Sequence, residues 1–201
     1  MTAVALTSEA ESLTAELYGK LPARRAVILC HGQSWDASGW KDIAPRFAAR
    51  GIPALALNFR GYASSTGSTT PASTVADLRA AKAWLRQNGV SELALVGASM
   101  GGHAVLGSSF ERDIECVVSV SAPVQPVDDA LSRNVTGRKL FICANEDNLG
   151  AAPHVLHTFE LCERPKTLML FGGTEHSIGM FFAPYGGEVI AAMLDFVAGR
   201  G

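Results

Sequence analysis

The sequence predicts an α/β protein in which a mostly parallel sheet of about seven strands has helices on both faces. From Arg25 onward, short β-branched apolar runs alternate with longer amphipathic segments, which is typical of strands joined by crossover helices. The apolar runs lack polar alternate positions, so both faces of each strand are expected to be buried. The length of 201 residues suits one domain, 1–201, whose core needs no disulfide or metal.

Each element can be placed from its apolar pattern. The parallel strands are expected at 25–30, 54–59, 93–97, 115–121, 139–144 and 166–171, and a weaker, antiparallel strand near 13–18. The amphipathic segments predict helices at 38–50, 73–88, 100–110, 151–162 and 187–198. Gly51 and Gly89 stand where a left-handed residue commonly ends a helix. The polar or glycine-rich segments 60–71 and 172–187 are expected to be loops.

Charge and cysteine content limit the class of partner. The chain has 17 Lys and Arg against 19 Asp and Glu, a net charge of -2, without a long run of either sign. Nucleic acid is therefore not expected as a partner, because phosphate backbones are bound through clustered positive charge. The four cysteines have no metal-ligand spacing, so we expect reduced thiols and no metal.

The composition also favours a protein that acts on a small molecule in the cytoplasm. No basic stretch precedes an apolar one near the N-terminus, and no apolar run reaches the roughly 20 residues that cross a bilayer. We therefore expect no secretion signal and no membrane span. The sequence leaves open whether the chain is a monomer or a homodimer.

A G-x-S-x-G pattern, Gly97-Ala98-Ser99-Met100-Gly101, lies between a predicted strand and a predicted helix. A nucleophilic serine requires such a junction, because the sharp turn exposes its hydroxyl at the edge of the sheet. Side chains at the two glycines would collide with the neighbouring strand or helix. The alternative is that Ser99 only caps the helix, but its position between strand and helix favours the nucleophile.

A serine hydroxyl needs a general base, and an acid must orient that base. His176 follows the last predicted strand and is the expected base. Asp147 follows the strand before it and is the expected acid. Glu146 stands beside Asp147, and Asp128 and Asp129 follow the preceding strand, so these three carboxylates remain alternatives.

The other titratable groups are expected to have structural positions. His154 and His157 lie on one predicted helix and are expected at its surface, whereas His103 is expected to pack beneath the serine turn. His31 flanks a glycine and is expected to brace its own loop. Glu175 is too close to His176 along the chain to reach its ring.

An oxyanion needs two backbone N–H donors. Met100 follows the serine and is expected to supply one, and Gln33, after the turn at Gly32, is expected to supply the other. Aromatic and thioether side chains on loops near the same edge predict an apolar substrate pocket. Its expected members are Trp35, Tyr62, Met180 and Phe181. For Met180 and Phe181, burial in the core or a contact between subunits remains an alternative.

From about Arg25 to Arg200 the chain resembles the α/β-hydrolase superfamily. The resemblance rests on four ordered landmarks: His31-Gly32 with Trp40 downstream, NFRGYASS at 58–65, GASMGG at 97–102, and the pair Asp147 and His176. It is greatest to small capless esterases and dienelactone-hydrolase-like members, although the latter often have cysteine as the nucleophile. The resemblance implies an acyl-enzyme mechanism that uses no metal or organic cofactor.

Two positions depart from the family pattern D-x-R-G-x-G-x-S. Asn58 stands where the family has Asp, and Ala63 where it has Gly. Neither position is catalytic in the family, so we expect a changed loop shape with activity retained. The chain between the strands at 115–121 and 139–144 is also too short for a helical cap, so any lid must be a loop.

These observations predict a serine hydrolase that cleaves small to medium carboxylic esters or thioesters through an acyl-enzyme on Ser99. The same landmarks also fit cofactor-free lyases, C–C hydrolases and perhydrolases, because those enzymes differ in pocket detail. A slow or inactive ligand-binding member of the fold is the alternative outside enzymology. The single glycine of His31-Gly32-Gln33 disfavours bulky tertiary-alcohol esters by analogy with the family.

Overall fold

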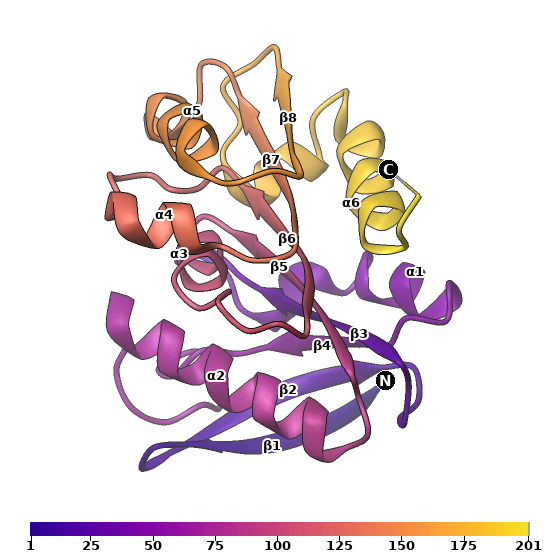
Figure 1. Ribbon diagram of the computed structural model, residues 1–201. Coiled ribbons are helices and arrows are strands. Elements are labelled where there is room, and N and C mark those ends of the chain that lie inside the picture. The colour runs from indigo at the N-terminus through magenta and orange to yellow at the C-terminus, as the bar shows by residue number, and fades with distance from the viewer. Residues whose placement is uncertain (201) are drawn as a thin grey trace.

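The computed structural model describes residues 1–200, and its centre is a sheet of eight strands (Figure 1). The strand order across the sheet is β1-β2-β4-β3-β5-β6-β7-β8. The strands are β1 (Thr2–Ser8), β2 (Glu11–Tyr18), β3 (Arg25–Cys30), β4 (Ala54–Leu57), β5 (Glu92–Ala98), β6 (Ile114–Val120), β7 (Arg138–Ala144) and β8 (Lys166–Phe171). β3 to β8 pair in parallel, while β2 pairs antiparallel with both β1 and β4. The predicted mostly parallel sheet is confirmed.

The structure contains one strand more than the seven expected. β1 forms a hairpin with β2 through a tight turn in which Glu9 has a φ of 56°. Only Leu6 and Ser8 of β1 are buried, so the strand lacks the apolar run that marks the inner strands. An edge strand with one buried apolar side chain cannot be read from hydrophobicity alone.

Helices cover both faces of the sheet. They are η1 (Ala37–Trp40), α1 (Ala44–Ala49), α2 (Pro71–Gln87), α3 (Met100–Leu106), α4 (Asp129–Asn134), α5 (Ala151–Leu161), η2 (Ser177–Phe181) and α6 (Gly186–Val197), where η denotes a 3-10 helix. Figure 1 shows α2, α3, α4 and α5 on one side of the sheet and α1 and α6 on the other. Two apolar clusters fill the spaces between these layers.

The prediction of one continuous helix at 38–50 is wrong. The chain forms the short η1 and then α1, with Pro45 in the first turn of α1. Proline has no N–H and clashes with the preceding turn, so it is tolerated at a helix start and not in an interior. Gly51 and Gly89 have φ of 75° and 83°, which confirms both as left-handed residues that follow helices.

Two short helices were also missed. α4 and η2 lie in segments that the sequence left without an element, and each has only five or six residues, too few for a helical period to be visible. The segment between β6 and β7 holds only α4 in the described chain. No helical cap is inserted there, as the short connection predicted.

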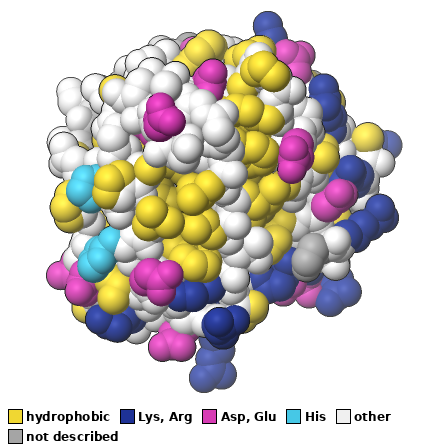
Figure 2. Space-filling model, turned by 90° about the horizontal axis from the view of Figure 1, so that it is seen from above, with side chains coloured by type: hydrophobic (Ala, Val, Ile, Leu, Met, Phe, Trp, Pro, Cys, Tyr) yellow, Lys and Arg dark blue, Asp and Glu magenta, His cyan; other side chains and the backbone are white. Residues whose placement is uncertain are grey.

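β8 is the strand at one edge of the sheet, paired only with β7 among the described strands. In Figure 2, apolar side chains gather over this edge, between α5 and α6. Leu170 of β8 and Phe182 after η2 are 45% and 75% exposed. No helix within residues 1–200 combines the length and apolarity needed to cross a bilayer.

Candidate active site

Ser99 lies in a strained turn between β5 and α3, with φ 51° and ψ -114°. The adjacent glycines make this turn possible. A Cβ on Gly97 would lie 2.2 Å from the carbonyl oxygen of Gly101, and a Cβ on Gly101 would lie 2.2 Å from the carbonyl oxygen of Cys30. The expected collisions with the helix and with a neighbouring strand are therefore confirmed.

Ser99 is the first member of a continuous hydrogen-bonded chain of three side chains. Its Oγ lies 2.8 Å from Nε2 of His176. Nδ1 of the same ring lies 2.8 Å and 3.0 Å from the two carboxylate oxygens of Asp147. The turn after β5, the loop after β7 and the loop after β8 each contribute one of these residues, so parallel strand ends bring the three together.

The Asp147 carboxylate is buried and firmly oriented. Its Oδ1 also accepts the backbone N–H groups of Leu149 at 3.0 Å and Ala151 at 3.3 Å. Burial alone would raise the pKa of Asp147, but the hydrogen bond and charge of His176, together with these two N–H groups, lower it below its ordinary value. Asp147 is therefore an anion that can hold one tautomer of His176 and stabilise its protonated form.

The alternative carboxylates have other positions. Asp128 caps α4 by accepting the N–H groups of Ala130 and Leu131. Asp129 contacts the exposed His157 at 3.1 Å. Glu146 is exposed, and Glu175 accepts a hydrogen bond from Tyr185 at 2.7 Å. Among the acids that the sequence left open, Asp147 is the one that contacts His176.

The two backbone N–H groups expected to hold an oxyanion belong to loops that meet at this turn: Met100 follows Ser99 at the start of α3, and Gln33 follows Gly32. The turn at Gly32 brings the Gln33 loop close, because a Cβ on Gly32 would lie 3.4 Å from Cβ of Ser99. This arrangement can present two donors to an oxyanion formed on a substrate of Ser99.

His31 braces the Gln33 loop, as the sequence predicted. Its Nδ1 lies 2.9 Å from the Gly32 carbonyl oxygen, and its Nε2 accepts the N–H of Phe59 at 3.2 Å. Burial lowers the pKa of His31, so the ring is neutral and donates from Nδ1. His103 has a comparable role in another loop, since its Nε2 accepts the N–H of Val124 at 3.3 Å.

The departures from the family pattern have structural consequences in the same region. Asn58 accepts the N–H of Ala37 at 2.7 Å and donates to the Thr14 hydroxyl at 2.9 Å, so its amide ties η1 to β2. Ala63 has a φ of 49°, a conformation that glycine adopts more easily. The loop therefore includes one residue under backbone strain.

A hollow of about 380 Å³ opens beside the Gln33 loop. Trp35 and Tyr62, both predicted as pocket residues, line it together with Gln33 and three neighbours. The Tyr62 hydroxyl lies 3.8 Å from the sulfur of Met100, and its ring packs against His31. Through Tyr62 the hollow is therefore linked to Met100, the residue after Ser99.

The assignment of Met180 and Phe181 to the substrate pocket is corrected. Met180 is fully buried and its sulfur accepts a hydrogen bond from Ser121, while Phe181 is 8% exposed and packs against Trp40. Both side chains belong to the core, because η2 turns them inward beneath α6. The loop has no hydrophobic periodicity in the sequence, so the inward direction of these two side chains could not be predicted.

Sequence reasoning missed a pair of serines that support the histidine loop. Ser177, the residue after His176, donates its backbone N–H to the Ser121 hydroxyl at 2.9 Å. Both residues have left-handed backbone, with φ of 57° and 51°. Ser121 directly follows β6, as Ser99 directly follows β5. This position after a strand is the one signal in the sequence that could have marked Ser121.

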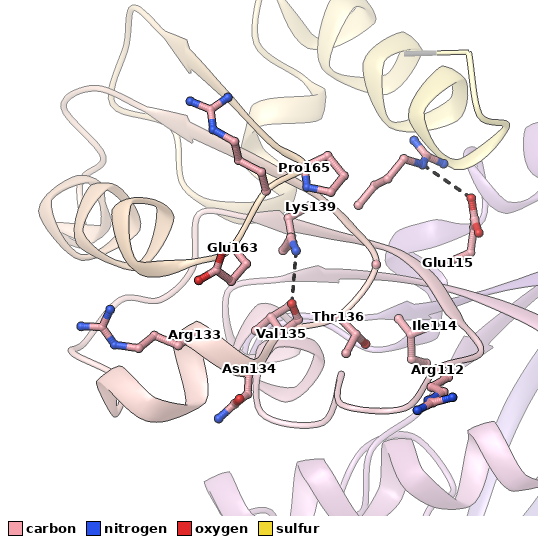
Figure 3. A pocket seen from close by; sticks show the side chains of 13 residues that line it. Arg112, Ile114, Glu115, Arg133, Asn134, Val135, Thr136, Lys139, Glu163 and Pro165 are labelled. Atoms are coloured by element: carbon pink, nitrogen blue, oxygen red, sulfur yellow. Dashed lines mark hydrogen bonds and ion pairs between the residues drawn. The ribbon is translucent and has the colours of Figure 1, made fainter.

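A larger hollow, of about 620 Å³, lies at the amino ends of β6, β7 and β8. Figure 3 shows its charged groups held by internal partners or directed apart. The buried Lys139 ammonium donates to the Val135 carbonyl at 3.2 Å, and Arg138 lies 3.5 Å from Glu115. Arg112 and Arg133 lie on opposite sides of the hollow. Within residues 1–200, no cluster of His, Cys, Asp or Glu is arranged as a metal site.

Comparison with curated proteins finds relatives that match part or most of the chain. Among curated proteins, a 90-residue segment is 31% identical to an uncharacterized protein of Mycobacterium tuberculosis, covering 43% of this chain and 32% of that protein. Over 187 residues the chain is 28% identical to Protein ABHD14A of Danio rerio, covering 87% of this chain and 65% of that protein. The chain thus spans about a third to two thirds of the length of these relatives.

Solved structures with the same fold cover both chains almost completely. A CIB-like hydrolase from Thermoplasma acidophilum superposes with a TM-score of 0.82 at 17% identity, covering 98% of each chain. A serine hydrolase without lid from Xanthomonas campestris superposes with a TM-score of 0.81 at 23% identity, covering 99% of this chain and 94% of the other. The family model described as the alpha/beta hydrolase family matches residues 27–196. The chain belongs to the alpha/beta hydrolase family.

Proposed function

We propose that the protein is a serine hydrolase that cleaves carboxylic esters or thioesters of small to medium size. The observation that carries this proposal is the unbroken chain from Ser99 Oγ through His176 to Asp147, with the serine on a strained turn. Such a chain activates a hydroxyl that is otherwise a weak nucleophile. Esterases and lipases among proteins of similar fold agree with this class of reaction.

In the first half of the reaction, Ser99 Oγ attacks the carbonyl carbon of the ester while Nε2 of His176 takes the hydroxyl proton. The carbonyl oxygen becomes an oxyanion, which accepts the N–H groups of Gln33 and Met100. Collapse of this intermediate breaks the bond to the leaving alcohol or thiol, and His176 gives it the proton. The acyl group is then bound to Ser99, and Asp147 has stabilised the imidazolium throughout.

The second half repeats these steps with water. His176 removes a proton from a water molecule, the resulting hydroxide attacks the acyl carbon, and the same N–H groups hold the oxyanion. Breaking the bond to Ser99 releases the carboxylic acid and restores the serine hydroxyl. Without a cap between β6 and β7, the loops around the site select the substrate.

The test combines covalent labelling with turnover. A fluorophosphonate probe is expected to label the wild-type protein on Ser99, and Ser99→Ala is expected to abolish both labelling and hydrolysis of p-nitrophenyl acetate. Circular dichroism of the variant is the control for folding. Unchanged turnover in Ser99→Ala refutes the proposal. Labelling without hydrolysis of any ester or thioester favours the lyase and C–C hydrolase alternatives, and no labelling favours a ligand-binding protein.

A further inference from the structure

The hollow beside the Gln33 loop has a lining that is aromatic and polar with little charge. Its volume is about 380 Å³, and its lining contains two aromatic side chains, three uncharged polar side chains and a single charged group. These residues are Gln33, Ser34, Trp35, Asp36, Ser38 and Tyr62. The charged group is the Asp36 carboxylate, so the lining as a whole carries one negative charge and no positive charge.

This hollow begins at the loop that approaches Ser99. One wall begins at Gln33, whose neighbour Gly32 approaches the Ser99 side chain closely. The other wall is Tyr62, whose hydroxyl contacts the sulfur of Met100 at 3.8 Å. A group that occupies the hollow can therefore belong to the same molecule as a carbonyl bound at Ser99.

The Asp36 carboxylate has hydrogen bonds but no counter-ion. Its Oδ1 accepts the N–H of Ser38 at 2.8 Å, and this hydrogen bond caps the start of η1. Within residues 1–200, no Lys, Arg or His forms an ion pair with it. Hydrogen bonds from Ser38 hold the pKa of Asp36 below its ordinary value, so the group is an anion at neutral pH.

The aromatic neighbours complete a site for a cation. Trp35 is 44% exposed, and Tyr62 is half-buried and lines the same hollow. Indole and phenol rings attract ammonium groups through their negative faces, by about 0.5–2 kcal/mol. An unpaired carboxylate beside two such rings favours positive charge and disfavours a neutral or anionic group.

We propose that this hollow binds an ammonium group of the substrate, so that the preferred esters carry a positive charge on their alcohol or acyl part. The proposal rests on ester hydrolysis at Ser99 and names the class of ester. It assigns Asp36 as the charge that recognises the ammonium group and Trp35 and Tyr62 as the rings that contact it.

The experiment compares pairs of esters that differ only in charge. Acetylcholine is compared with the ester in which a neutral tert-butyl group replaces the trimethylammonium group, and a second pair carries the same two groups on the acyl side. We expect kcat/KM to be about tenfold higher for the charged member of at least one pair, which corresponds to about 1.4 kcal/mol. Asp36→Asn, which keeps the cap on η1, should reduce that ratio to about one.

A matched variant and a direct binding measurement complete the test. Asp42→Asn removes an exposed carboxylate from the same segment and should leave the ratio unchanged. Tetramethylammonium chloride should quench the fluorescence of wild-type protein, and Trp35→Phe should remove the quenching. Equal kcat/KM for both members of both pairs, in a protein that a fluorophosphonate labels, overturns the ammonium site and leaves the proposed function standing. Absence of labelling and of any hydrolysis overturns the proposed function. In that case quenching by tetramethylammonium still supports the ammonium site, and absence of quenching overturns it.

Discussion

The carboxyl and amino ends of the parallel strands are built from different turns. At the carboxyl ends, four residues other than glycine have a left-handed backbone, with φ between 49° and 57°: Ala63, Ser99, Ser121 and Ser177. At the amino ends, the left-handed residues before β4, β5 and β7 are Gly51, Gly89 and Gly137. A side chain in this conformation costs about 1–2 kcal/mol, so among the turns that join the parallel strands this strain falls at the carboxyl ends, although left-handed glycines such as Gly61 and Gly173 occur there too.

The same contrast separates the two hollows. The amino-end hollow is larger, at about 620 Å³ against about 380 Å³, but its charged groups are held by internal partners or directed apart. The carboxyl-end hollow is smaller, begins at the loop that approaches the strained Ser99, and is lined by the Asp36 carboxylate, which has no ion-pair partner in the described residues. Volume is therefore a poor guide to the site in this molecule, and strained backbone with convergent polar groups is a better one.

The largest effect is expected from Asp147→Asn, which keeps the size of the side chain and removes its charge. Loss of the carboxylate leaves His176 without the partner that fixes its tautomer and stabilises its protonated form, so kcat should fall by about 10³–10⁴-fold. Steady-state hydrolysis of p-nitrophenyl acetate measures this change. A fall of less than about tenfold would contradict the role of Asp147 and return Glu146 to consideration.

The same variant tests the pH dependence of stability. The folded-state pKa of Asp147 is lowered below the ordinary value of about 3.9. The contribution of the ionised carboxylate to stability is therefore present above about pH 4 and is lost as the pH falls through the folded-state pKa. Acid titrations followed by circular dichroism should show a shallower loss of stability for Asp147→Asn than for the wild type across that range.

At the amino ends the expected effect is on stability alone, and Gly137→Ala tests it. The new Cβ would lie 2.5 Å from the Ile114 carbonyl oxygen and 2.7 Å from that of Glu115, at a φ of 69°. We expect the free energy of unfolding to fall by about 2–3 kcal/mol, while kcat per folded molecule changes less than about twofold. Gly187→Ala, which meets no atom within 4 Å, is the control and should cost nothing.

A large loss of kcat in folded Gly137→Ala protein would contradict the distinction between the two ends of the strands, because it would show that the amino ends affect catalysis. Urea titration measures the stability, and active-site titration with the fluorophosphonate counts the folded molecules. Together these measurements separate a defect in folding from a defect in the site.

How far the sequence predicts this fold depends on which side chains an element buries. β3 to β8 are marked by continuous apolar runs, and each was placed to within two residues. β1 buries a single apolar side chain and was not seen. Pro45 divides a segment whose apolar period alone suggested one helix, so local backbone chemistry outweighed the periodic signal there.

The site residues also differ in how well the sequence identifies them. Ser99, Asp147 and His176 could be selected because each follows a strand and each has a side chain of distinctive chemistry. Met180 and Phe181 could not be assigned, since an apolar side chain in a loop has no pattern that tells core from pocket. Ser177 was missed because a left-handed φ at serine leaves no trace in sequence, and the one sign of Ser121 is its position after a strand.

A smaller effect on catalysis is expected from Ser121→Ala. The variant removes the acceptor of the buried Ser177 N–H and so loosens the loop that holds His176. An unpaired buried N–H costs about 1–3 kcal/mol, and we expect kcat to fall about tenfold with KM unchanged, because a misplaced base affects chemistry more than binding. Ser119→Ala removes a buried hydroxyl whose bond is to Ala122 on its own segment and is the matched control. Equal kcat in the two variants would make Ser121 a purely structural residue.

The smallest effect is expected from Ala63→Gly, and its sign decides whether backbone strain is the right account of the carboxyl ends. Ala63 has a φ of 49° and an exposed side chain, so glycine should remove about 1–2 kcal/mol of strain from the folded state. Glycine also makes the unfolded chain more flexible, which should lower the stability by about 0.4–1 kcal/mol. The expected net gain is about 0.5 kcal/mol, measured as a higher urea midpoint. The same substitution at Ala80, inside α2, should cost about 1 kcal/mol. Destabilisation of similar size at both positions would mean that Ala63 is not strained, and left-handed φ at the neighbouring serines would then lose its value as a mark of the site.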